Sequence, residues 1–292
     1  MKTLLSFFLL LSIAYAQDGI CVRSNDLSGG VAANVQKLNV SWFRKDIFAS
    51  QNRYFPDRIY AQAKAAGLTW LPILTQNFDG SNVVPHDPAK QDAWVAWAAQ
   101  QIDNYPEPLY EVWNEPDLQG SDPVDYANLV IKLNKARPNA RLLPPVTWTI
   151  DYAGAPKALA WMKTFLAVPG VQQAFWGLSC HIYESAASYP VTSQPITHKP
   201  WIQRLYTDMA RFMALCPGKP VYVTELGSWK VLDPTVAAAR EIAQYGTLMA
   251  LRVAGVFPYA LTGTNDPTQC WDHIDGNGNL TLLGIAWAGR GR

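Results

Sequence analysis

Short apolar runs alternate along the chain with longer segments in which apolar positions recur at helical spacing. An apolar run of about four to eight residues is typical of a buried strand, and recurrence every three to four residues is typical of a helix. This pattern predicts eight strands, at residues 19–23, 40–44, 70–74, 109–113, 141–145, 176–181, 220–224 and 255–261. It predicts helices at residues 56–66, 87–105, 122–136, 155–166, 201–215, 235–252 and 282–288.

Repeated strand–helix units predict a parallel sheet covered by helices. Eight strands in a chain of 292 residues predict an α/β fold that is a single-domain (β/α)8 TIM barrel. An open doubly wound sheet is the alternative, but no Gly-x-Gly-x-x-Gly follows any predicted strand. In a barrel, the residues that carry the chemistry stand at the carboxyl ends of the strands.

Residues 1–16 have the features of a signal peptide rather than of the fold. Lys2 provides a positive start, residues 4–14 are apolar, and Ala14-Tyr15-Ala16 has the form of a cleavage site. We therefore expect a secreted catalytic domain at residues 17–292. Export makes Cys21, Cys180, Cys216 and Cys270 eligible for disulfides, with three pairings open and buried free thiols as the alternative.

The charge of the chain narrows the choice of partner. Twenty-four basic and 23 acidic residues give a formal net charge of +1, so there is no basic field for nucleic acid and no polybasic patch for a membrane. No later stretch is apolar for long enough to span a bilayer. We expect a monomer that acts on a neutral partner.

The chain has 12 tryptophans, which fall into two groups. Eight lie within predicted strands and helices and are expected in the core: Trp42, Trp70, Trp94, Trp97, Trp161, Trp176, Trp201 and Trp287. Trp148, Trp229 and Trp271 follow predicted strands, where flat rings can pack on the C–H faces of sugars. Trp113 is compatible with either role.

Two carboxylates stand at predicted strand ends, Glu115 after the fourth strand and Glu225 after the seventh. These strands lie on opposite sides of a barrel mouth, so the two side chains can converge. Carboxylates about 5–5.5 Å apart suit a retaining glycosidase, and about 6.5–9.5 Å an inverting one. Retention needs one protonated and one ionised carboxyl group, and Arg44 at the second strand can hold one of them ionised.

The sequences Trp-Asn-Glu-Pro at residues 113–116 and Thr-Glu-Leu-Gly at residues 224–227 resemble motifs of clan A glycoside hydrolases. The longer segment 110–117 most resembles family 39, with family 5 second. The resemblance implies that Glu115 is the acid/base and Glu225 the nucleophile. It also implies substrate-site roles for four further residues: Arg44, Asn114, His181 and Tyr183.

Some residues depart from this pattern or have simpler explanations. Many relatives have a tryptophan near the end of strand eight, where this chain offers Tyr259 or, later, Trp271. A metal role for His181 is disfavoured because no second ligand lies at ligand spacing, and we expect no metal or cofactor. Residues 272–278 resemble a calcium loop but lack its final Glu, which favours a turn. Glu111, predicted to point inward, is expected to pair with a cation or polar group.

The sequence thus predicts a secreted retaining hydrolase of a neutral β-glycan, with an endo-acting β-glucanase preferred. Exo-acting β-xylosidase or β-glucosidase activity and endo-β-mannanase activity are alternatives, as is transglycosylation by the same residues. From another class, a catalytically inactive carbohydrate-binding barrel remains an alternative.

Overall fold

The computed structural model describes residues 17–23, 30–48, 53–75, 81–147, 155–185, 199–229, 233–261 and 272–290. The strands are β1 (Gly19–Cys21), β2 (Trp42–Ile47), β3 (Thr69–Leu74), β4 (Tyr110–Val112), β5 (Leu142–Leu143), β6 (Pro145–Thr147), β7 (Leu178–Ser185), β8 (Val221–Trp229) and β9 (Gly255–Pro258). The helices are α1 (Val31–Lys37), α2 (Tyr54–Ala65), α3 (Pro88–Asn104), α4 (Pro123–Ala136), α5 (Ala155–Ala167), α6 (Lys199–Met213), α7 (Pro234–Ala250) and α8 (Leu282–Ala288), with a 3-10 turn, η1, at Val171–Gln173.

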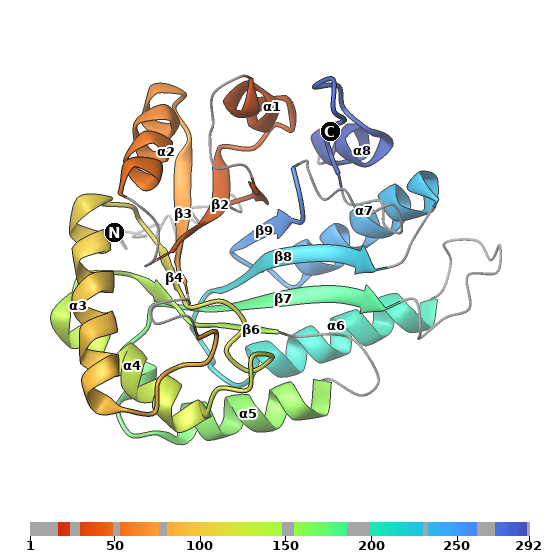
Figure 1. Cartoon of the computed structure of the whole chain (residues 1–292). Helices are drawn as coiled ribbons and strands as arrows, with labels where there is room; N and C mark the ends of the chain where they lie inside the picture. Colours follow the sequence, from red (N-terminus) through yellow and green to blue (C-terminus); the bar gives the residue numbers. More distant parts are fainter. Residues whose placement is uncertain are drawn as a thin grey trace, which may run out of the picture.

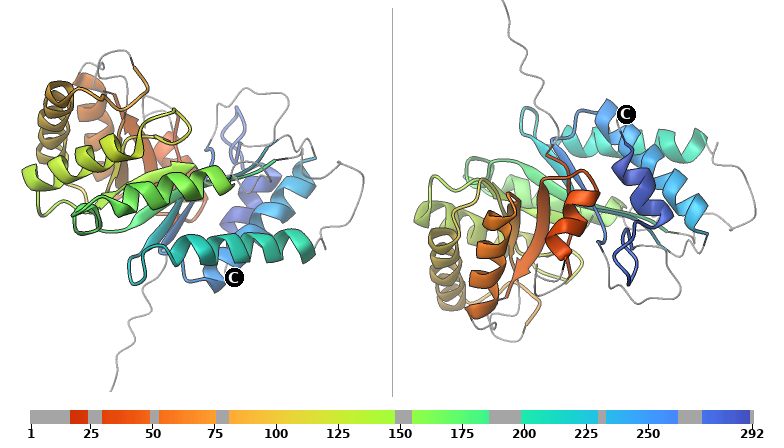
Figure 2. Two further views of the ribbon diagram at one scale, coloured as in Figure 1. Left: turned by 90° about the horizontal axis from the view of Figure 1, so that it is seen from below. Right: turned by 90° about the horizontal axis from the view of Figure 1, so that it is seen from above.

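The strands run parallel in the order β1 to β5 and β6 to β9 and form one closed wall. Only Pro144 separates β5 from β6. It has no N–H to donate to the ladder, although its carbonyl accepts a hydrogen bond from Ser179 N at 3.2 Å. The barrel closes between β9 and β1, where Leu261 N donates to Cys21 O at 2.8 Å. The helices surround the strands (Figures 1 and 2), and this arrangement confirms the predicted (β/α)8 barrel.

Three of the outer helices share one start signal. Asp87, Asp122 and Asp233 each accept backbone N–H groups of the first turn of α3, α4 and α7, and a proline follows each of them. The aspartate satisfies donors that have no partner inside the helix, and proline has the fixed φ of a first helical residue. The chain therefore turns from strand to helix at defined points, which fixes the loops at the mouth.

An apolar layer fills the lower part of the barrel. Its members are Cys21, Trp42, Leu71, Leu109, Leu143, Tyr222, Phe257 and Ala260. A Cβ on Gly19 would lie 2.3 Å from the Phe257 ring, so only glycine fits there. Trp42, Leu109 and Tyr222 stand two positions before Arg44, Glu111 and Thr224, and alternation of side chains along strands puts those polar residues in the next layer.

The structure corrects several details of the sequence-based prediction. Helix α1 was not predicted, because seven residues give too short a periodic signal to recognise. Trp176 was expected in the core but is 44% exposed, since it precedes β7, and the Arg141 guanidinium lies 4.4 Å from its ring centre. Of the other tryptophans expected in the core, Trp97 and Trp161 are only partly buried.

The thiols of Cys21, Cys180 and Cys216 are free and buried. Cys270 and residues 1–16 lie outside the described residues. A disulfide of Cys270 and the signal peptide therefore remain predictions. In the described part of the chain, none of the helices combines the length and apolarity needed to cross a membrane.

Candidate active site

Arg44 is the centre of a polar cluster above the apolar layer. It lies on β2, is buried, and points into the barrel. Its Nε donates to Glu111 Oε2 at 2.5 Å, its Nη1 to Glu225 Oε1 at 2.6 Å and its Nη2 to Asn114 Oδ1 at 2.8 Å. A guanidinium has five donors in a rigid fork, so this one side chain fixes groups from β4, from the loop after β4, and from β8.

Glu111 of β4 forms a buried ion pair with Arg44. Its carboxylate is fully buried and also accepts hydrogen bonds from Ser179 Oγ at 2.8 Å and Thr224 Oγ1 at 2.5 Å. Burial raises the pKa of Glu111, but the Arg44 charge, the hydrogen bond and charge of His181 and the Thr224 hydroxyl outweigh it and lower that pKa to about 2. Glu111 is therefore an ionised carboxylate that accepts three hydrogen bonds. Its ion pair with Arg44 confirms the expectation that it pairs with a cation.

A bulge in β8 brings Glu225 into the site. Val223 is paired with Cys180 of β7, but the next pair is Glu225 with His181, so Thr224 is an extra residue. In a regular strand Thr224 and Glu225 would point to opposite faces, whereas an extra residue re-aims a side chain. Both therefore contact inward groups, Thr224 through Glu111 and Glu225 through Arg44.

The predicted strand ends at the site were wrong. Strand β8 continues to Trp229, β7 to Ser185 and β2 to Ile47, so Glu225, His181 and Arg44 lie within strands. Polar side chains at these positions mark the layer in which the barrel interior opens to the mouth, while the backbone ladder continues beyond them.

Two donors hold the Glu225 carboxylate. Oε1 accepts from Arg44, and Oε2 accepts from the Tyr183 hydroxyl of β7. Burial raises the pKa of Tyr183 well above its ordinary value, and the Glu225 charge raises it further, so the hydroxyl keeps its proton. With one donor on each oxygen, the carboxylate has a fixed orientation.

The backbone around Glu115 is in an uncommon conformation. Trp113 has φ of 68° and Glu115 has φ of 49°, both in the left-handed region that non-glycine residues rarely adopt. Such residues cost on the order of 1–3 kcal/mol each and concentrate at functional sites. The Trp113 indole anchors this loop: it is buried, donates to Asn82 O at 3.1 Å and packs on Trp94. Trp113 is therefore a core residue.

His181 connects Arg44 to Glu115. Its Nδ1 lies 2.8 Å from Glu115 Oε1, and its Nε2 lies 3.1 Å from Arg44 Nη2. Burial lowers the pKa of His181, while the Glu225 charge and the other carboxylates raise it, and the balance lies above the ordinary value. A carboxylate oxygen can only accept, so we assign a proton to Nδ1, which donates to Glu115.

The two glutamates converge across the mouth. One oxygen of Glu115, one oxygen of Glu225 and a ring nitrogen of His181 all lie within 4.8 Å of one another. Sequence spacing offered His181 no second metal ligand, but the fold supplies two carboxylates. Arg44 already places a buried positive charge against Glu225 and His181, which electrostatically disfavours a divalent cation at this position.

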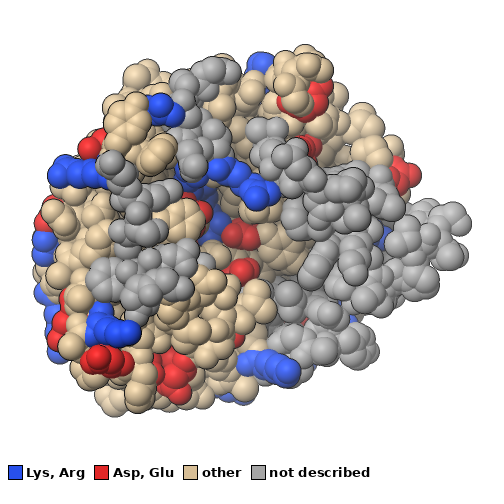
Figure 3. All heavy atoms as spheres, in the orientation of Figure 1, with Lys and Arg blue, Asp and Glu red and all other residues tan. Residues whose placement is uncertain are grey.

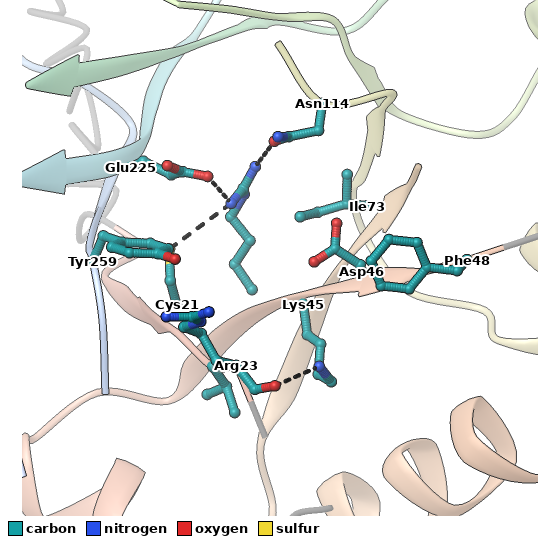
Figure 4. Close-up of a pocket in the computed structure, with 11 residues that line it drawn as sticks. Cys21, Arg23, Lys45, Asp46, Phe48, Ile73, Asn114, Glu225 and Tyr259 are labelled. Carbon is teal, nitrogen blue, oxygen red and sulfur yellow. Dashed lines mark hydrogen bonds and ion pairs between the residues drawn. The ribbon is translucent and has the colours of Figure 1, made fainter. Parts of the chain in front are cut away.

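A cavity of about 300 Å³ opens beside Glu225 (Figure 4). Asn114 and Tyr259 line it, and the Tyr259 ring meets that of Tyr183 edge-on, with centroids 6.3 Å apart. Figure 3, in the orientation of Figure 1, shows acidic and basic side chains together in a hollow near the middle of the molecule. Asp46, which was not predicted from the sequence, also lines the cavity, and its alternation with Arg44 along β2 is the signal that could have identified it.

The other predicted aromatic residues cannot be placed in the site. Trp148 and Trp271 lie outside the described residues, and only the backbone of Trp229, the last residue of β8, is described. Their contacts with a sugar stay predictions.

Two glutamates that converge at the mouth of a (β/α)8 barrel supply the pair of carboxyl groups that glycoside hydrolysis uses. The family model described as "Glycosyl hydrolase catalytic core" matches residues 75–287, a range that includes both Glu115 and Glu225. The chain therefore belongs to the glycosyl hydrolase catalytic core family. No curated protein sequence matches the chain.

Solved structures share the fold at low sequence identity. An endo-β-1,4-glucanase from Xanthomonas axonopodis pv. citri has a TM-score of 0.69 and 12% identity, covering 94% of this chain and 98% of its own. A family 128, subgroup II, endo-β-1,3-glucanase from Sorangium cellulosum has a TM-score of 0.62 and 14% identity, with the same two coverages. An endo-1,4-β-mannanase from Rhizomucor miehei has a TM-score of 0.64 and 12% identity, covering 94% and 95%.

Proposed function

We propose that the chain is a secreted, monomeric, retaining β-glycoside hydrolase, and within that class an endo-acting β-glucanase. The observation that carries the retaining mechanism is the approach of the two carboxylates. Their nearest oxygens lie within 4.8 Å, which fits the separation of about 5–5.5 Å typical of retention and leaves little room for the extra water of inversion.

In this proposal Glu225 is the nucleophile and Glu115 the acid/base. Glu115 protonates the glycosidic oxygen while Glu225 attacks the anomeric carbon, and a covalent glycosyl-enzyme forms as the leaving group departs. A water molecule then attacks the anomeric carbon and gives its proton to Glu115, and the Glu225 carboxylate is released. Arg44 and Tyr183 support the nucleophile, because they aim both of its oxygens.

Asn114 and His181 orient groups at the reacting centre. Asn114 Oδ1 accepts from Arg44, so its amide NH2 remains to donate to a sugar hydroxyl next to the attacked carbon. His181 donates to Glu115 and so positions the acid/base. None of these steps needs a metal or cofactor.

The substrate proposal is a neutral β-glycan. The two glucanases that share the fold act on β-1,3- and β-1,4-linked glucan, and the mannanase acts on a β-1,4-linked glycan. Uncharged sugars also suit a chain whose formal net charge is +1. The resemblance to family 39 stays a prediction, since the matching family model has the coarser description.

The test is a screen of purified protein on a defined panel of polysaccharides: β-1,3-glucan, β-1,4-glucan, xylan and mannan. We expect the wild type to release oligosaccharides from a β-glucan, and product chain lengths read by mass spectrometry to show internal cleavage. Glu225→Gln should lose at least 10³-fold in rate, roughly the loss seen when a catalytic nucleophile is removed.

Each other outcome rejects a stated part of the proposal. Release of monosaccharide alone would indicate an exo-acting enzyme, and longer products would indicate transglycosylation. Near-normal hydrolysis by Glu225→Gln would refute the assigned nucleophile, and binding of glycans without turnover by the wild type would identify a carbohydrate-binding barrel.

A further inference from the structure

The cavity beside Glu225 lies on one particular side of the reacting centre. Glu225 and Asn114 line it, but Glu115 does not. In the proposed mechanism the nucleophile contacts the sugar whose anomeric carbon is attacked, and the acid contacts the departing oxygen. The cavity is therefore where the sugars on the non-reducing side of the broken bond would lie.

Asp46 is the acidic side chain in the wall of this cavity that the mechanism does not use. It stands two residues after Arg44 on β2, so alternation puts both on the inward face. Figure 4 shows its carboxylate directed toward the middle of the cavity, near Ile73 and Phe48. In the described ranges of the chain, no hydrogen bond or ion pair within 4 Å involves this carboxylate.

The surroundings of Asp46 leave its charge poorly solvated. The residue is half-buried, and burial raises its pKa although the charges of Arg44 and Lys45 act in the opposite direction. A buried carboxylate without hydrogen-bond donors costs free energy. Donors brought by a ligand would remove that cost, and a sugar ring carries several hydroxyl donors.

The neighbouring side chains favour a neutral sugar. Phe48 and Ile73 give the wall apolar surface on which the C–H face of a sugar can pack. Lys45 also lines the cavity, but its Nζ donates to Arg23 O at 3.2 Å, and Figure 4 shows it directed away from Asp46. The lining carries two carboxylates, Asp46 and Glu225, and three cations, Arg23, Arg44 and Lys45. These charges nearly cancel, so the wall has little net charge with which to select a charged sugar.

We propose that Asp46 is a specificity-determining residue that accepts hydrogen bonds from hydroxyl groups of a neutral sugar on the non-reducing side of the cleaved bond. The inference rests on the proposed function, because the cavity is assigned to that side by the roles of Glu115 and Glu225. The inference adds Asp46 as a binding residue and the hydroxyl groups of the bound sugar as the feature that it recognises.

Binding is tested without turnover in a Glu115→Gln protein, since Glu115 does not line the cavity. Calorimetry with cellotetraose and laminaritetraose compares this protein alone, with Asp46→Asn, and with Asp92→Asn. Asp92 is a matched control because its side chain is 68% exposed on α3. Losing a hydrogen bond to a charged group predicts about 10- to 100-fold weaker binding for Asp46→Asn, and Asp92→Asn should not change it.

A second measurement separates recognition from a folding effect. Hydrolysis of 4-nitrophenyl β-cellobioside is compared with that of its monodeoxy analogues, in the wild type and in Asp46→Asn. One missing hydroxyl should lower kcat/KM by about 10-fold or more in the wild type, and that penalty should disappear in Asp46→Asn. A misfolded variant would hydrolyse all of these substrates more slowly, but one missing hydroxyl would still lower kcat/KM by the same factor as in the wild type.

The proposal is overturned by equal affinity of the Asp46→Asn and control proteins, by no binding of either tetrasaccharide, or by a deoxy penalty that persists in Asp46→Asn. Faster hydrolysis of 4-nitrophenyl β-glucuronide than of the β-glucoside would also overturn it. If the wild type hydrolyses nothing but binding depends on Asp46, the proposed function fails while the sugar site stands.

Discussion

Replacing Glu111 by glutamine removes one negative charge from beneath the site and keeps the size of the side chain. The carboxylate is fully buried, accepts the Arg44 Nε–H at 2.5 Å and accepts two hydroxyl groups. Glutamine would place an amide group against the guanidinium and leave Arg44 with Glu225 as its remaining buried carboxylate partner. Removing one partner of a buried ion pair is strongly destabilising.

The pKa of Glu111 gives the size of the effect. It is lowered from 4.5 to about 2, so the ionised carboxylate stabilises the folded chain above pH 4.5 and loses this effect as the pH falls through 2. The difference corresponds to about 3 kcal/mol at pH 7. At pH 3 only about 1 kcal/mol remains, because the unfolded chain is then protonated and the folded chain is still ionised.

Urea unfolding followed by circular dichroism measures the free energy of unfolding at pH 7, 5 and 3. We expect Glu111→Gln to be less stable than the wild type by about 3 kcal/mol at pH 7 and 5, with a smaller difference at pH 3. Asp92→Asn, which removes an exposed ion pair with Lys132, should change stability by less than about 1 kcal/mol. If the wild type and Glu111→Gln have the same free energy of unfolding at pH 7, or differ by the same amount at all three pH values, the ionised Glu111 carboxylate does not stabilise the fold as described.

Three further substitutions test the support of the nucleophile and the packing of α8. Tyr183→Phe removes the hydroxyl donor to Glu225 and should lower kcat by about 10- to 100-fold, with KM little changed; unchanged kcat in steady-state assays would contradict the assigned support. Gly284→Ala would place a Cβ 2.0 Å from His273 O and should lower the melting temperature, whereas Gly246→Ala in α7 meets nothing within 4 Å and should raise stability by about 0.5–1 kcal/mol. Equal melting temperatures for the two alanine variants would contradict the described packing.

The barrel was predictable because its strands and helices leave strong local signals. Proline after Asp122 marked the start of α4, and apolar runs such as residues 70–74 marked strands. Glu115 and Glu225 followed from the rule that barrel chemistry lies toward the carboxyl ends of strands. That rule needs only the order of the elements, not their exact limits.

Features that depend on pairing between distant strands were not predictable. The bulge that turns Glu225 inward exists only in the register between β7 and β8, and no local pattern around Thr224 encodes it. Asp46 was missed because β2 continues to Ile47, three residues beyond the predicted end. Trp176 was placed in the core because the predicted strand 176–181 included it, whereas β7 begins at Leu178 and the Trp176 ring lies at the surface under Arg141.

The stereochemistry of the first product shows whether Glu225 forms a covalent intermediate with the sugar. Hydrolysis of the preferred β-glycan is followed by proton NMR, with spectra taken before the released sugar can mutarotate. Attack by Glu225 and then by water inverts the anomeric carbon twice, so we expect the β-anomer to accumulate first and the α-anomer later. If the α-anomer appears first, water attacks directly, and the paired roles of Glu115 and Glu225 are wrong.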